Sequence, residues 1–217
     1  MTTPRLPSRR AALSAGFASL AAVSLPTESS AVPTKAPGET RVVYFGGDYA
    51  HNGIAQERYL RETFSASGWR IFFAQASRFI TPQLLAGTDL LMMTRTGTTD
   101  VLGYSPEGLV DVRPEPDPLL PPPVLDALID NIRNRGMGFL ALHCTAGNPQ
   151  FPKLMELIGV RPAKSGAIIQ PVRHHDFDPD HPITRGFTEF EVKDDENLKK
   201  EIVDPAVTIL FKSTGVQ

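Results

Sequence analysis

Histidine, cysteine and threonine follow one apolar run of this sequence so closely that they could form a reactive site. Residues 139–142 are continuously apolar and lead into His143, Cys144 and Thr145. Such a run is typical of a strand that is buried on both faces of a parallel sheet. Ligands of these sheets bind at the carboxyl ends of the strands. We therefore expect the three polar residues at the mouth of a crevice.

Two further apolar runs end in polar residues in the same way. Residues 41–45 predict the first strand, and the glycine-containing loop after it holds Asp48 and His51. Residues 89–93 predict another strand, which ends just before Arg95. Parallel strands bring their carboxyl ends to one edge, so His51 is expected beside His143. The residues predicted to contact a substrate are Asp48, His51, Cys144, Thr145 and Arg95.

His143 is the candidate for proton transfer. An ordinary imidazole has a pKa near 6.5, so it exchanges protons readily around neutral pH. The plainer interpretation is a capping histidine that is bonded to nearby backbone. His51 and His143 together could also hold a divalent metal such as zinc, which binds imidazole nitrogen at about 2.0–2.1 Å. Their spacing is not that of a helical zinc motif.

Cys144 suggests a third chemistry, that of a cysteine-dependent hydrolase. A nucleophile that follows a strand can be exposed by a sharp turn. Such a turn needs flanking glycines, however, and the glycine next along the chain is Gly147. The alternative is a small, unreactive thiol. A hydrolase of this kind predicts complete loss of activity in Cys144→Ser.

Composition favours one domain that handles small molecules. The chain has 217 residues, a formal net charge of -2 and a single cysteine. One domain with a sizeable core fits this length. The balanced charge gives no indication of nucleic acid as a partner, and one cysteine excludes an internal disulfide.

Residues 1–39 are predicted to be an export signal and linker, and residues 40–217 the folded domain. Arg9 and Arg10 precede an alanine-rich apolar stretch, which resembles a twin-arginine signal. The stretch is short for a membrane span of about 20 residues, although a membrane anchor is the alternative interpretation. We expect a periplasmic or secreted protein without stable membrane insertion after signal removal.

The remaining patterns predict alternating strands and helices. Helices are expected over 54–66, 81–85, 124–135 and 151–158, and strands over 69–73, 167–172, 187–192 and 207–211. Residues 97–123 are predicted to be a long loop, either a lid or a disordered insertion. The alternation implies an α/β fold with a mostly parallel sheet covered by helices on both faces.

Several of these segments together resemble the ThuA-like (trehalose utilisation) family of the class I glutamine amidotransferase-like superfamily. The matching pieces are residues 42–51, 138–143, 178–187 and 190–192, with Asp195 and Glu196. The resemblance implies a flavodoxin-like three-layer α/β/α fold and the handling of sugars or their oxidised derivatives. It places His143 in the neighbourhood where related amidotransferases carry a nucleophile, and we predict His143, Asp195 and Glu196 as the catalytic residues.

The sequence departs from the family pattern at two places. Leu198 stands where the family often has an aromatic residue, and the family usually continues beyond the last strand, so the domain is expected to be shortened at its C-terminus. The superfamily's cysteine triad is not reproduced, and glutamine hydrolysis is therefore not expected. Two hypotheses follow: an enzyme acting on a carbohydrate or keto-sugar through His143, or a non-catalytic sugar-binding module of the same fold.

Overall fold

The computed structural model describes residues 35–48, 51–95, 103–105, 108–110, 120–146, 152–162, 169–195 and 200–215. The apolar stretch of the predicted export signal lies outside these residues. The first strand begins at Arg41.

Four parallel strands form the central sheet of the domain. They are β1 (Arg41–Gly46), β2 (Arg70–Ala74), β3 (Leu90–Thr94) and β6 (Gly138–Ala141). Their order is β2-β1-β3-β6, and every neighbouring pair is parallel. This is the strand order of flavodoxin-like folds. The predicted α/β fold class is confirmed.

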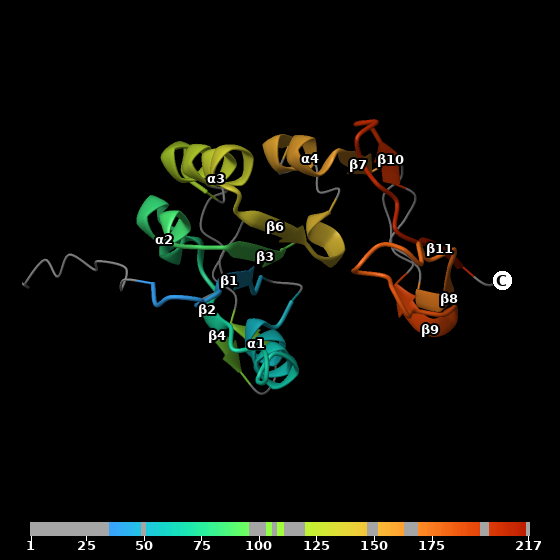
Figure 1. The fold of residues 1–217 in the computed structure, drawn as a ribbon. Helices are drawn as coiled ribbons and strands as arrows, with labels where there is room; N and C mark the ends of the chain where they lie inside the picture. Colours follow the sequence, from blue (N-terminus) through green and yellow to red (C-terminus); the bar gives the residue numbers. More distant parts are fainter. Residues whose placement is uncertain are drawn as a thin grey trace, which may run out of the picture. The chain divides into compact units, whose positions relative to one another are not determined.

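Helices cover both faces of this sheet (Figure 1). They are α1 (Gly53–Thr63), α2 (Pro82–Ala86), α3 (Pro122–Arg135) and α4 (Pro152–Ile158), with short 3-10 turns η1 (Ser77–Phe79) and η2 (His143–Thr145). Side chains of β1 alternate between two cores. Phe45 packs with Leu85 of α2 and Leu128 of α3, whereas Tyr44 packs with Leu60 of α1. The two cores make this part of the molecule a three-layer α/β/α sandwich.

Local signals set the ends of two helices. The hydroxyl oxygen of Thr81 accepts a hydrogen bond from the backbone N–H of Leu84 at 3.1 Å, and Pro82 occupies the first helical position of α2. Gly136 ends α3 in the left-handed conformation at φ 76°, which costs glycine less than other residues. Both features agree with the helix limits predicted over 81–85 and 124–135.

The C-terminal strands differ from the prediction, because they form antiparallel sheets of their own. The strands are β7 (Val160–Pro162), β8 (Ile169–His175), β9 (Phe190–Asp195), β10 (Lys200–Ile202) and β11 (Lys212–Gly215). One sheet has the order β11-β8-β9, and β10 pairs with β7. The strand predicted over 207–211 is wrong, since this segment is irregular and β11 begins at Lys212.

The segment predicted to be a long loop contains regular structure. Within residues 97–123, β4 (Gly103–Ser105) and β5 (Gly108–Val110) pair as antiparallel strands, and α3 already begins at Pro122. The rest of the expected lid lies outside the described residues.

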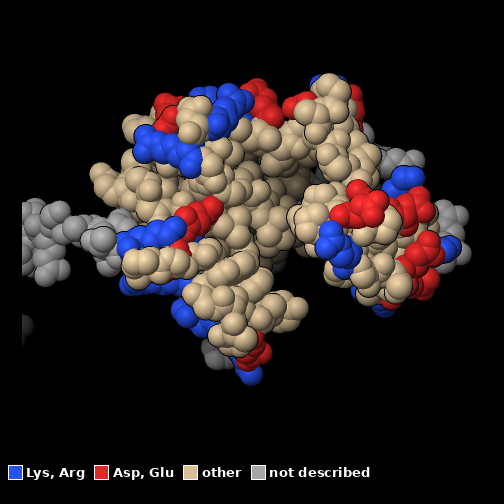
Figure 2. All heavy atoms as spheres, viewed as in Figure 1, with Lys and Arg blue, Asp and Glu red and all other residues tan. Residues whose placement is uncertain are grey.

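Charged side chains of both signs are interspersed on the face drawn in Figure 2. Several charged residues of the domain form exposed ion pairs, among them Arg161 with Glu201 and Lys212 with Asp176. Exposed pairs of this kind each contribute little stability. Within the described ranges, no helix combines the length and apolar character that a membrane crossing requires.

Two carboxylates near the start of the sheet are expected to make the fold sensitive to acid. Hydrogen bonds from Arg41 and the Ala36 backbone lower the pKa of Glu39 from 4.5 to about 2. The backbone N–H of Arg41, followed by Lys35, lowers the pKa of Asp89. In the unfolded chain both groups regain protons at higher pH, so their stabilisation is complete above about pH 5 and is lost as pH falls toward 2.

We predict that the free energy of unfolding of Glu39→Gln falls less between pH 5 and pH 3 than that of the wild type, as urea unfolding would measure. The matched control is Glu62→Gln, which alters a helix-surface pair whose carboxylate side chain is 68% exposed. If the free energy of unfolding depended on pH equally in the two variants, the assignment to Glu39 would be contradicted.

Candidate functional site

β1, β3 and β6 end side by side at the carboxyl edge of the central sheet. Gly46 is paired with Thr94, and Met93 with Ala141, so the three strands end at nearly the same level. Because the strands are parallel and in register, the residues that follow them share this edge. It includes the point between β1 and β3 where the direction of strand order reverses, the usual position of ligands in such folds.

His51 and His143 lie against each other at this edge. Their ring centroids are 5.4 Å apart, and the planes meet at 75° in an edge-to-face arrangement. His143 is exposed, whereas the side chain of His51 is only 15% exposed. The backbone of His143 has φ 51°, a left-handed conformation that is uncommon for a residue with a side chain. Such conformations occur often at functional sites.

Asp48 holds His51 in place through hydrogen bonds to its ring and its backbone. Its side chain is fully buried, and its Oδ1 accepts hydrogen bonds from His51 Nδ1 at 2.8 Å and from the His51 backbone N–H at 2.9 Å. The two residues also exchange backbone hydrogen bonds of 3.1 and 3.2 Å across a short bridge. Asp48 therefore holds His51 in place, and its predicted contact with substrate stays a prediction.

Arg95 and Thr145 are buried at the base of the same edge, each with 0% exposure. The hydroxyl of Thr145 accepts from the Arg95 backbone N–H at 2.7 Å and donates to the Arg95 carbonyl at 3.2 Å. The guanidinium of Arg95 lies 4.7 Å from the ring centre of Phe45. These contacts tie the end of β3 to the turn that carries His143. The predicted contact of either residue with substrate stays a prediction.

The structure describes less of the other predicted site residues. Cys144 belongs to η2 and Asp195 ends β9, but their side chains are not described, and Glu196 lies outside the described residues. Their predicted roles as thiol and catalytic carboxylates stay predictions. The structure thus brings together His51, His143 and Asp48, with Arg95 and Thr145 below them.

A second cluster of polar groups lies at the end of β8 and in the segment before β9. His175, Asp176 and Glu189 have ligand atoms within 4.8 Å of one another. Asp176 also pairs with Lys212, which together with His175 lowers its pKa, and Glu189 pairs with Arg173. The carboxylates of this exposed cluster are therefore already neutralised by cations.

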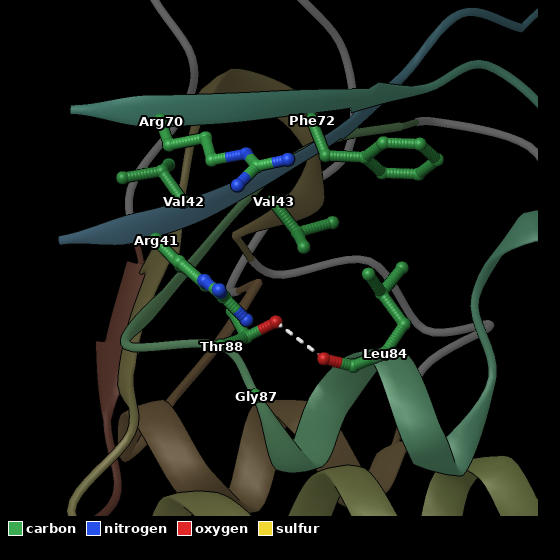
Figure 3. Close-up of a pocket in the computed structure, with 8 residues that line it drawn as sticks. All are labelled: Arg41, Val42, Val43, Arg70, Phe72, Leu84, Gly87 and Thr88. Carbon is green, nitrogen blue, oxygen red and sulfur yellow. Dashed lines mark hydrogen bonds between the residues drawn. The ribbon is translucent and has the colours of Figure 1, made fainter. Parts of the chain in front are cut away.

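Two hollows lie at the amino ends of the strands, away from the histidines. One is a cavity of about 120 Å³ between β1, β2 and α2, where Val43, Phe72 and Leu84 form apolar walls (Figure 3). Thr88 donates its hydroxyl to the Leu84 carbonyl there. The other, of about 500 Å³, is lined by Lys35, Asp89 and Arg135 among others. Because ligands of open α/β sheets bind at the opposite edge, we place the functional site at the histidines.

Comparison with known proteins supports the fold. No family model matches the sequence, and no curated protein matches it either. A crystal structure of a protein from Bacteroides uniformis described as ThuA-like superposes with a TM-score of 0.51 and 13% sequence identity. The match covers 74% of this chain and 62% of that protein. At this identity the likeness concerns the fold alone.

Proposed function

We propose that this chain is an exported ThuA-like domain protein that acts on a carbohydrate or keto-sugar derivative, with His143 as acid and base. The observation that supports it is the approach of the His51 and His143 rings at the carboxyl edge of the sheet. The fold of the ThuA-like neighbour agrees with the sequence resemblance that suggested sugar chemistry. The exposed ring of His143 is accessible to a molecule in solution.

The chemistry that suits this site is proton transfer beside a carbonyl. His143 removes the proton from the carbon next to a keto group, and the C–H electron pair forms the carbon–carbon double bond of an enediol. The carbonyl oxygen takes up a proton from water as its π pair moves onto it. Returning a proton to carbon restores a ketone, so the cycle needs no oxidant or reductant. A positioned acid or base accelerates such steps by about 10²–10⁴-fold.

The test uses disaccharides oxidised at one ring hydroxyl, incubated with the protein in heavy water. We expect the proton NMR signal next to the keto group to fade faster than in buffer alone, as deuterium replaces hydrogen. If calorimetry detected binding of a disaccharide but NMR detected no deuterium exchange, the result would instead favour the non-catalytic sugar-binding module. Absence of both binding and exchange across the panel would refute the proposed function.

Export through the twin-arginine route is part of the same proposal and has a separate test. A reporter fused after Thr40 should reach the periplasm, and replacing Arg9 and Arg10 by lysine should keep it in the cytoplasm. Arrival that does not depend on the two arginines would exclude this route.

A further inference from the structure

The contacts of Asp48 fix more than the position of His51. A carboxylate only accepts hydrogen bonds, and Oδ1 of Asp48 lies 2.8 Å from His51 Nδ1. The same oxygen accepts the backbone N–H of His51 at 2.9 Å, which holds the carboxylate in place. A neutral His51 ring must therefore carry its proton on Nδ1 to donate to Asp48. Its Nε2 is then unprotonated.

The surroundings of Asp48 keep this arrangement rigid. Its side chain has 0% exposure, so water does not compete for the carboxylate. Two backbone hydrogen bonds also join Asp48 and His51 directly. A buried carboxylate that orients a histidine in this way sets which ring nitrogen reacts.

His174 offers a contrast within the same chain. Its Nδ1 lies 2.8 Å from the Ser213 hydroxyl, which can donate or accept and so leaves the ring's proton position open. Free imidazole rings of histidine favour the proton on Nε2. The Asp48 contact therefore predicts that His51 carries its proton on Nδ1 instead.

We propose that Asp48 is a positioning residue that holds His51 in the Nδ1-protonated form, which makes Nε2 of His51 the second proton-transfer atom of the site beside His143. The role of Nε2 in proton transfer rests on the proposed function. In that setting Nε2 accepts the proton of an enediol hydroxyl as the ketone is restored, while His143 returns a proton to the neighbouring carbon, and His51 then releases its proton to water. The assignment of the ring proton itself is independent of any substrate.

Nitrogen-15 NMR of the histidine rings in the full chain tests the proposal directly. At a pH where His51 is neutral, we expect a protonated Nδ1 and an unprotonated Nε2. In Asp48→Ala the ring should shift toward the Nε2-protonated form. Ser213→Ala should leave His51 unchanged. A wild-type His51 that carries its proton on Nε2 would overturn the proposal, whether or not any variant folds.

Activity measurements separate this inference from the proposed function. With a reactive keto-disaccharide, Asp48→Ala should lower kcat by on the order of 10²-fold with little change in KM. Asp48→Asn should recover part of the loss, because its amide oxygen can still accept from Nδ1. If His51 shows the expected proton position but no keto-sugar reacts, the proposed function fails and the role of Asp48 stands. Equal turnover in wild type and Asp48→Ala would refute the positioning role.

Discussion

His143→Gln is expected to lower turnover of a keto-sugar by about 10²–10⁴-fold while sugar affinity stays within a few-fold. Glutamine keeps similar length and polarity but cannot shuttle protons at neutral pH. The exposed position of His143 means that the loss should not come from the core. Proton NMR of deuterium exchange measures the rate, and calorimetry measures the affinity.

Two variants separate chemistry from structure at this position. His143→Gly fits the backbone at φ 51° without the strain of a side chain, so it should fold at least as well and still lose turnover. Cys144→Ser should retain turnover. If Cys144→Ser alone abolished activity and His143→Gln did not, the thiol would be the reactive group and the histidine assignment would be wrong.

Phe45→Ala is expected to have the largest effect on stability, lowering the free energy of unfolding by about 3–5 kcal/mol. The ring of Phe45 has 0% exposure, packs between β1 and the α2 and α3 helices, and contacts the buried guanidinium of Arg95 at 4.7 Å. Truncation leaves a cavity and removes an apolar and π contact from a buried cation. Urea unfolding gives the change in free energy.

Phe79 provides a matched control for this variant. Its ring also lies 4.7 Å from an arginine, Arg78, but it is 45% exposed. Phe79→Ala should therefore cost much less than Phe45→Ala. Similar losses in the two variants would mean that the core around Phe45 can collapse around the missing ring. The bracing role of the Phe45 and Arg95 contact would then be refuted.

The N-terminal half of the fold was predictable because its signals are local. Buried parallel strands such as β1 and β3 are continuous apolar runs, and Thr81, Pro82 and Gly136 mark helix ends by their own chemistry. Once these strands are placed in parallel, the meeting of His51 and His143 follows from topology.

The C-terminal half was less predictable, because its strands depend on pairing between distant segments. The apolar residues 207–211 predict a strand, yet β8 instead pairs with the polar Lys212–Gly215. The strand predicted over 167–172 extends further in the structure, so that His174 and His175 lie in β8 and bond to hydroxyls of β11. The roles of Asp48, Thr145 and Arg95 also depended on burial, which their residue types do not indicate.

The central claim is that His51 and His143 form one site, and ring-to-ring nuclear Overhauser effects measure this directly. The His174 and Phe190 rings, with centroids 4.7 Å apart, serve as the internal standard. We predict a cross-peak between ring protons of His51 and His143 in addition to that of the standard pair. A spectrum that shows the standard cross-peak and, with both histidines assigned, none between His51 and His143 would contradict the account.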